Sequence, residues 1–319
     1  MKVLVYGAGV LGSIYAGHLH QTGTDVTMLA RGERFAILRQ HGLILQDAHT
    51  GEQTFSRIPV TKTIEPHEQY DLVIVTVRRN QVDNVLPFLR NRKLLNVLFM
   101  VNNASGYQDW IDAVGRERLL IGFPGAGGTI EGPVVRYRIV PGWLQPTTLG
   151  ELDGIGTLRL KRIASVFRHA GFPVATCRNM SAWQKAHVAW VSPLANAIYM
   201  AGGSGVRFAQ MPKAADLTAR AIREGFMVLK ALNVPITPAK LRILCWIPES
   251  VLASMLRAWA KTEYFETVAA RHANIANDEM EVLAEEFREL ASATSIPTPA
   301  IDELRSYIPR TIPPRTNVA

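Results

Sequence analysis

The first half of the chain alternates short apolar runs with stretches of helical, amphipathic spacing. The clearest apolar runs are residues 3–6, 26–29, 72–77 and 97–101. Runs that are apolar at nearly every position are typical of parallel strands buried on both faces. The pattern therefore predicts a parallel sheet covered by helices.

Residues 115–150 continue the strand-rich pattern, with apolar runs at 119–123 and 134–140. Three glycines within residues 125–128 lie between these runs and predict a tight loop. We expect both runs to extend the same sheet. A helix and one more short strand within residues 155–176 then close the first domain.

Strand patterns end near residue 179, and the remainder has helical spacing. The predicted helices are 183–200, 214–232, 251–264 and 266–290. Helices without intervening strands indicate an all-helical second domain. We therefore predict an α/β domain over residues 1–177 and a helical domain over residues 178–319.

A glycine-rich motif, Gly7-Ala-Gly-Val-Leu-Gly12, follows the first predicted strand at once and precedes a helical segment. Gly7 permits a tight turn, Gly9 lets a pyrophosphate approach the backbone, and Gly12 lets helix and strand pack closely. Free N–H groups at the helix start favour phosphate. In this context the motif predicts dinucleotide binding by Gly7, Gly9, Val10, Leu11 and Gly12. The alternative is a turn with no ligand.

The end of the second predicted strand bears on the choice of cofactor. NAD-binding domains commonly place an acidic residue there to bind the ribose hydroxyls. This chain has Arg31 instead, with Arg34 three residues later. Arginine suits bidentate recognition of a 2′-phosphate, so the sequence favours NADPH. Alternatively, both arginines simply begin a solvated helix.

Lys185 immediately precedes an uncharged segment, residues 186–206. Partial burial would lower the pKa of such a lysine toward the range of a general acid. The alternative is a surface lysine whose aliphatic stem packs on the protein. The uncharged segment also contains polar residues, proline and glycine, so we interpret it as a buried helix and expect no membrane association.

The 319 residues are 48% hydrophobic and 19% charged, with a formal net charge of +8, which indicates a folded chain. Basic pairs such as Arg78–Arg79 and Lys161–Arg162 are scattered, which argues against nucleic-acid binding. Cys177 and Cys245 are the only cysteines. They predict neither a disulfide framework nor a metal site, and they fit a cytoplasmic setting.

Several markers, in this order, resemble the ketopantoate reductase family. They are the glycine motif, residues 73–77 with Arg78 and Gln81, Asn102-Asn103, residues 150–154, Ala170-Gly171, Trp183-x-Lys185 and Ser254-Met255. The resemblance implies a Rossmann-type NADP-binding domain followed by a helical substrate domain. It also implies reduction of a 2-keto acid to a 2-hydroxy acid by NADPH in the cleft between them.

The resemblance also implies roles for individual residues. Lys185 corresponds to the family's catalytic lysine, which protonates the developing alkoxide. Asn103 corresponds to an asparagine that contacts cofactor and substrate. Ser254 is similar to a serine that binds the substrate carboxylate, although a helical serine is usually solvated or back-bonded. Arg78 stands where the family usually has a cofactor-binding lysine.

The family's acidic partner can be placed at two positions. Glu266 stands 12 residues after Ser254, as the family spacing suggests. Counting back from Pro297 points instead to residues 277–279, where Glu279 shares a helical face with His272 and with Ile275 or Ala276. We prefer Glu279 as the second catalytic residue.

One departure concerns the substrate. Two family asparagines that follow the catalytic lysine and hold a substrate hydroxyl correspond here to Ala189 and to Ser192 or Pro193. Ser192 and Asn196 lie near the Lys185 face and are candidate substitutes. We expect weaker recognition of ketopantoate.

The sequence is also compatible with other functions of the whole chain. They are a reductase of another small keto acid, a 3-hydroxyacid dehydrogenase of the 6-phosphogluconate dehydrogenase type, and a non-catalytic NADP-binding regulator. A homodimer is compatible with the sequence.

Overall fold

The computed structural model describes residues 1–65, 68–90, 92 and 95–309, and the chain divides into two compact units. The first comprises Met1–Asn102 and Gly106–Ser181, and the second comprises Asn103–Ser105 and the chain from Ala182 onward. The division after Ser181 lies four residues beyond the boundary expected at 177. The assignment of Asn103–Ser105 to the second unit was not anticipated.

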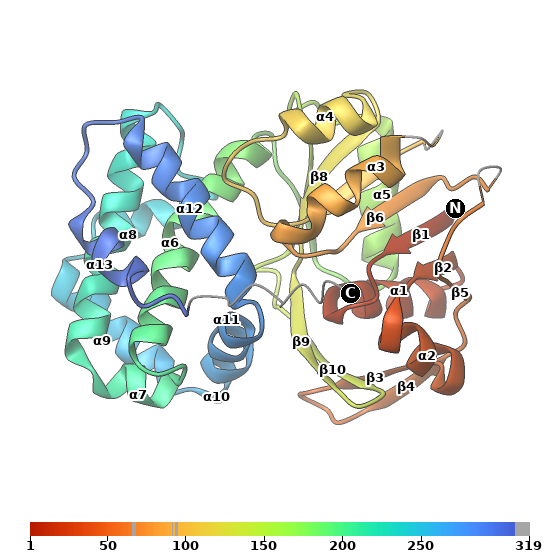
Figure 1. The fold of residues 1–319 in the computed structure, drawn as a ribbon, viewed down its shortest axis with the longest axis horizontal. Coiled ribbons are helices and arrows are strands. Elements are labelled where there is room, and N and C mark those ends of the chain that lie inside the picture. The colour runs from red at the N-terminus through yellow and green to blue at the C-terminus, as the bar shows by residue number, and fades with distance from the viewer. Residues whose placement is uncertain (66–67, 91, 93–94, 310–319) are drawn as a thin grey trace, which may run out of the picture. The chain divides into compact units, whose positions relative to one another are not determined.

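The first unit is built on an eight-stranded sheet in the order β12-β11-β8-β7-β6-β1-β2-β5. Strands β8, β6, β1, β2 and β5 of this sheet are labelled in Figure 1. Its strands are β1 (Lys2–Tyr6), β2 (Asp25–Leu29), β5 (Val60–Thr61), β6 (Leu72–Val75), β7 (Val97–Met100), β8 (Leu119–Phe123), β11 (Thr147–Glu151) and β12 (Val174–Thr176). All neighbouring pairs are parallel except β8 and β11. Every residue of β6 and β7 is buried, which confirms the predicted covered sheet.

Helices cover this sheet, and their ends follow local sequence signals. They are α1 (Val10–Gln21), α2 (Gly32–His41), the 3-10 segment η1 (Arg79–Asn84), α3 (Leu86–Arg90), α4 (Gln108–Val114) and α5 (Leu158–His169). Helix α5 starts three residues later than the sequence predicted. Thr157 caps it, because its hydroxyl accepts a hydrogen bond from the Leu160 N–H at 3.1 Å.

A second sheet of four strands, in the order β4-β3-β10-β9, corrects two predictions. Its strands are β3 (Leu43–Asp47), β4 (Gln53–Ser56), β9 (Ala126–Glu131) and β10 (Val134–Ile139). The run at 134–140 pairs here rather than extending the large sheet, and the glycines predicted as a loop lie in or beside β9. A Cβ on Gly128 would lie 2.1 Å from the Arg136 carbonyl oxygen, so close strand pairing explains that glycine.

The second unit is helical, as predicted, and its described part contains no strand. It contains most of α6 (Met180–Met200), α7 (Gly205–Gln210), α8 (Pro212–Ala231), η2 (Ala239–Cys245), α9 (Glu249–Ala260), α10 (Glu263–Phe265), the π-helical η3 (Glu266–Ala270), α11 (Arg271–Ile275), α12 (Asn277–Ser292) and α13 (Pro299–Arg305). The predicted helix at 266–290 is interrupted at Ala276, which precedes α12. Small residues let the helices approach closely: a Cβ on Gly225 of α8 would lie 3.2 Å from the Ala189 Cβ of α6.

Candidate functional site

The glycine motif forms the turn between β1, in the interior of the sheet, and α1. Gly7 has a φ of 109°, and its carbonyl accepts a hydrogen bond from the Thr76 hydroxyl at 2.9 Å. A Cβ on Gly12 would lie 1.8 Å from the Gly7 carbonyl oxygen, so Gly12 is required for the close approach of helix and strand. By contrast, a Cβ on Gly9 would meet nothing within 4 Å. The fold therefore gives no packing reason for glycine at position 9.

The start of α1 has no side chain bonded to its backbone. Gly9 is the N-cap residue, no side-chain cap is present, and no acidic residue lies in the first turn. Val10 and Leu11 open the helix and are half-buried. Unfilled N–H groups beside an open glycine turn are what a pyrophosphate requires. The residues present thus fit a dinucleotide.

The two arginines near the end of β2 differ in their surroundings. Arg31 is exposed, and its guanidinium donates a hydrogen bond to the Tyr6 hydroxyl at 2.6 Å. Arg34 is half-buried and donates to the Ala8 carbonyl and to the Ser13 hydroxyl, both at 3.0 Å. Burial lowers the pKa of Arg34. Arg34 therefore supports the glycine turn rather than beginning a solvated helix, and Arg31 is the arginine accessible to a ligand.

Arg78 follows β6, which ends two residues earlier than predicted. Its backbone N–H donates to the Gln81 side chain at 3.3 Å, at the start of η1. Arg78 is half-buried and lies beyond the carboxyl end of a strand adjacent to β1. Since the carboxyl ends of parallel strands lie at one edge of the sheet, Arg78 lies at the same edge as the glycine motif.

Lys185 lies on α6, is half-buried, and has its pKa lowered by loss of solvent. At helical spacing, Ala189, Ser192 and Asn196 share its face. Ser192 is 5% exposed and Asn196 is 2% exposed. Ala189 is fully buried, and a Cβ on Gly225 would lie 3.2 Å from its Cβ, so helix packing fills this position.

Asn103 lies in the short segment that belongs to the second unit, and its side chain is 2% exposed. The neighbouring Ala104 N–H and Ser105 hydroxyl both donate to Glu286, at 2.8 and 3.1 Å. Sequence reasoning missed Glu286. No motif marks it, and 182 residues separate it from Ala104.

The other candidate side chains lie on α9, η3 and α12. Ser254 is exposed, and its hydroxyl donates to the Ser250 carbonyl at 2.8 Å, which is the back-bonded state of a helical serine. Glu266 accepts from the Gly205 N–H at 2.9 Å and so holds the start of α7. Glu279 is 5% exposed in the first turn of α12. Its preference over Glu266 as the acidic partner stays a prediction.

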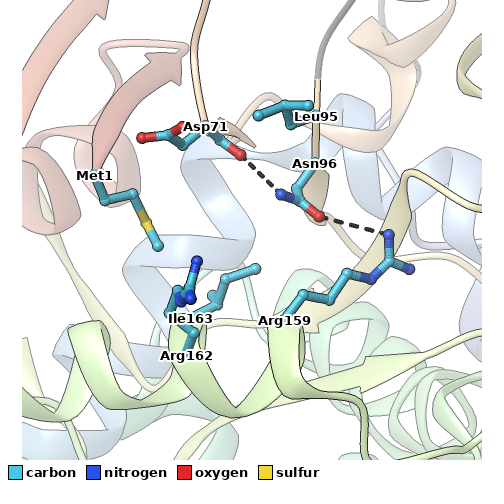
Figure 2. A pocket seen from close by; sticks show the side chains of 7 residues that line it. All are labelled: Met1, Asp71, Leu95, Asn96, Arg159, Arg162 and Ile163. Atoms are coloured by element: carbon cyan, nitrogen blue, oxygen red, sulfur yellow. Dashed lines mark hydrogen bonds between the residues drawn. The ribbon is translucent and has the colours of Figure 1, made fainter.

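A cavity of about 390 Å³ lies in the first unit. Figure 2 shows the side chains that line it. Met1, Asp71 and Asn96, which line it, immediately precede β1, β6 and β7. It is therefore at the amino ends of the strands, whereas dinucleotides bind at the carboxyl ends. Arg159, which also lines it, is ion-paired with the buried Glu151. We do not assign the cofactor to this cavity.

Among the described residues, no group of three or more His, Cys, Asp or Glu side chains is arranged to hold a metal ion. Within the same part of the chain, no helix is long and apolar enough to cross a membrane.

The sequence of the chain is similar to those of one known protein family. The model described as "Ketopantoate reductase PanE/ApbA" matches residues 3–154. The chain is 24% identical over 198 residues to 2-dehydropantoate 2-reductase of Pyrococcus horikoshii, covering 61% of each protein. It is 25% identical over 175 residues to the enzyme of that name from Listeria monocytogenes, covering 52% of this chain and 59% of that one. The matches thus span about three fifths of these curated relatives.

Solved structures share the fold over nearly the whole chain. A 2-dehydropantoate 2-reductase from Geobacter metallireducens has a TM-score of 0.79 at 16% identity, covering 97% of this chain and 99% of that one. D-mandelate dehydrogenase with NADH and anilino(oxo)acetate has a TM-score of 0.76 at 17% identity, covering 97% of both chains.

Proposed function

We propose that this chain, whose residues 3–154 match the ketopantoate reductase family model, is an oxidoreductase that uses NADPH to reduce a small 2-keto acid to a 2-hydroxy acid. The observation that carries the proposal is the half-buried Lys185 with its lowered pKa. A dinucleotide motif alone is compatible with many reactions, whereas a desolvated ammonium supplies the acid that carbonyl reduction needs.

The cofactor assignment is supported by the residues around the glycine motif. The open position at Gly9 and the amides of Val10 and Leu11 would hold the pyrophosphate. Arg31 would bind the 2′-phosphate that distinguishes NADPH from NADH, with Arg78 as a further cation on the same side of the sheet. NADPH, when bound, supplies the hydride for the carbonyl carbon.

Lys185 would act on the carbonyl oxygen of the substrate. Negative charge develops on that oxygen as the carbon is reduced, and an ammonium nearby stabilises it. The ammonium then donates a proton and leaves a 2-hydroxy acid. Its lowered pKa makes this donation easier than from a solvated lysine. Glu279 is proposed as the acidic partner of this step.

The substrate would be recognised by Asn103, Ser192, Asn196 and Ser254, with Lys185 attracting its carboxylate. Ala189 offers no polar group and is packed against Gly225, so the hydroxyl-binding amide of the family is not replaced at that position. A site without that amide gains little from a substrate hydroxyl. We therefore expect keto acids lacking the ketopantoate hydroxyl to be used at least as well.

The proposal is tested by following NADPH oxidation with a panel of 2-keto acids. Ketopantoate, its dehydroxylated analogue 2-oxo-3,3-dimethylbutanoate, pyruvate and phenylglyoxylate cover polar, branched, small and aromatic substrates. The last is the keto acid corresponding to mandelate. Saturable oxidation with at least one compound is expected. A complete lack of oxidation by folded, NADPH-binding protein would refute the proposed reaction.

A further inference from the structure

Arg34 reaches from α2 to the turn of the glycine motif, 26 residues earlier in the chain. Its Nε donates to the Ala8 carbonyl and its Nη2 donates to the Ser13 hydroxyl, both at 3.0 Å. The Ser13 hydroxyl donates to the same Ala8 carbonyl at 3.3 Å. A guanidinium can only donate, so the Ser13 proton is left for Ala8. Two donors therefore converge on one carbonyl oxygen of the turn.

The held carbonyl fixes the direction of the next amide. The Ala8 carbonyl and the Gly9 N–H belong to one trans peptide group, in which they point in opposite directions. The Gly9 N–H therefore points away from Arg34. Gly9 is exposed, and in the part of the chain that the structure describes no acceptor is bonded to its N–H. The turn thus holds an unused donor on the side opposite to Arg34.

We infer that Arg34 is a positioning residue, which aims the Gly9 N–H at a phosphate of the dinucleotide by holding the Ala8 carbonyl. The open space beside Gly9 and the unfilled amides at the start of α1 give a phosphate room and further donors. If the peptide group rotated, its carbonyl oxygen would face the phosphate and repel it. The inference rests on the proposed cofactor and is independent of the proposed substrate.

The charge of Arg34 acts in the same direction. The guanidinium is half-buried, its Nη1 is fully buried without a hydrogen-bond partner among the described residues, and burial alone lowers its pKa. No carboxylate of the described chain forms an ion pair with it. A buried cation without a counter-charge is unfavourable. A bound pyrophosphate would place negative charge across the Ala8–Gly9 peptide from this cation, so Arg34 favours the occupied turn.

Fluorescence titration with NADPH and with NADH is the first test. Arg34→Met removes both donors and the charge. We expect it to weaken both cofactors by the same factor, roughly tenfold, because both contain the pyrophosphate. Arg34→Lys, which keeps a cationic donor, should recover part of this loss. Arg39→Met, at an exposed position of the same helix, should bind both cofactors like the wild type.

Two results of this titration would overturn the inference. Unchanged affinity in Arg34→Met would show that the turn does not need Arg34 to bind the cofactor. A loss confined to NADPH would assign Arg34 to the 2′-phosphate instead of the pyrophosphate.

The second test is NMR of protein labelled with ¹⁵N-glycine, which separates aiming of the amide from general support of the fold. The Gly9 signal is identified by its loss in Gly9→Ala. At saturating NADH, the Gly9 amide proton should move downfield in the wild type, because it donates to a charged acceptor, and much less in Arg34→Met. If Arg34→Met does not fold, Ser13→Ala removes the other donor to Ala8 and should reduce the shift in the same direction.

An equal Gly9 shift in the wild type and in the variant would overturn the inference. The outcomes also distinguish this inference from the proposed function. If wild-type protein binds NADPH but reduces no keto acid, the proposed reaction fails, and both binding tests still decide the role of Arg34. If the wild type binds neither cofactor, the proposed cofactor and the inference fail together.

Discussion

Arg31 and Tyr6 are joined by a hydrogen bond of 2.6 Å between a guanidinium nitrogen and the phenol oxygen, although 25 residues separate them. Tyr6 ends β1 and Arg31 follows β2, so the contact lies at the carboxyl edge of the sheet. The bond holds an exposed cation beside the glycine motif. This geometry leads to the first prediction.

Arg31→Ala is expected to weaken NADPH binding by roughly ten- to a hundredfold, because a charge-assisted contact with the 2′-phosphate is lost. NADH, which lacks that phosphate, should bind almost as before. Fluorescence titration of both cofactors measures the ratio, with Arg39→Ala, an exposed position on the helix that begins just after Arg31, as the control. Equal affinity of the wild-type protein for the two cofactors would remove this role from Arg31.

Gly9→Ala should separate binding from folding. Its added methyl group meets no protein atom within 4 Å, so the melting temperature should stay within a few degrees of the wild type. The methyl group would occupy the space that a pyrophosphate needs, so NADPH affinity should fall at least roughly tenfold. Gly156→Ala, another exposed site with open space, is the matched control. Normal NADPH binding by Gly9→Ala would place the cofactor elsewhere.

Glu224 is predicted to make stability depend on pH. Its buried carboxylate accepts from the N–H groups of Ala300 and Ile301, each at 3.0 Å, at the start of α13. Burial raises its folded-state pKa above 4.5, despite those hydrogen bonds. The folded chain then holds its proton to higher pH than the unfolded chain. The contribution of Glu224 to stability therefore falls as pH rises from 4.5 through the raised pKa, and is level above it.

Urea unfolding of the wild type and of Glu224→Gln, at several pH values across this window, isolates that contribution. The difference between the two proteins should change with pH in the stated direction. A difference independent of pH would contradict the raised pKa. Glu224→Ala should cost about 1–3 kcal/mol, since the α13 amides lose their acceptor.

The sequence predicted those parts of the site whose contacts are local. The glycine motif lies between consecutive elements, so the order strand, turn, helix was readable from residues 2–21. The prediction of a loop at Gly128 was wrong, because glycine is required there by strand pairing rather than by a turn. The Arg136 carbonyl, which leaves no room for a side chain at position 128, comes close only when β9 and β10 pair.

Glu286 illustrates a second limit. A glutamate on an amphipathic helix is normally solvated, and nothing in α12 indicates that this one accepts from Ala104 and Ser105. Similarly, the sequence identified the substitution at Ala189, but its packing against Gly225 depends on how α6 and α8 meet. Both contacts join segments far apart in the chain, where spacing carries no signal.

The pH dependence of turnover follows from Lys185. The general acid must be protonated, and loss of solvent lowers its pKa below 10.5. We expect kcat/KM to fall as pH rises through this lowered pKa, with the plateau on the acidic side of the transition. Rates with NADPH and the best keto acid of the panel at increasing pH measure it. An alkaline limb that persists unchanged in Lys185→Arg would assign the transition to another group.

The central claim, that Lys185 is the acid of an NADPH-dependent reduction, is tested most directly by the turnover number of Lys185→Ala with the best keto acid found. We predict a loss of roughly 10²- to 10⁴-fold, with NADPH affinity within about twofold of the wild type. Lys230→Ala, an exposed lysine of α8, should retain full activity. Unchanged turnover in Lys185→Ala would contradict the account.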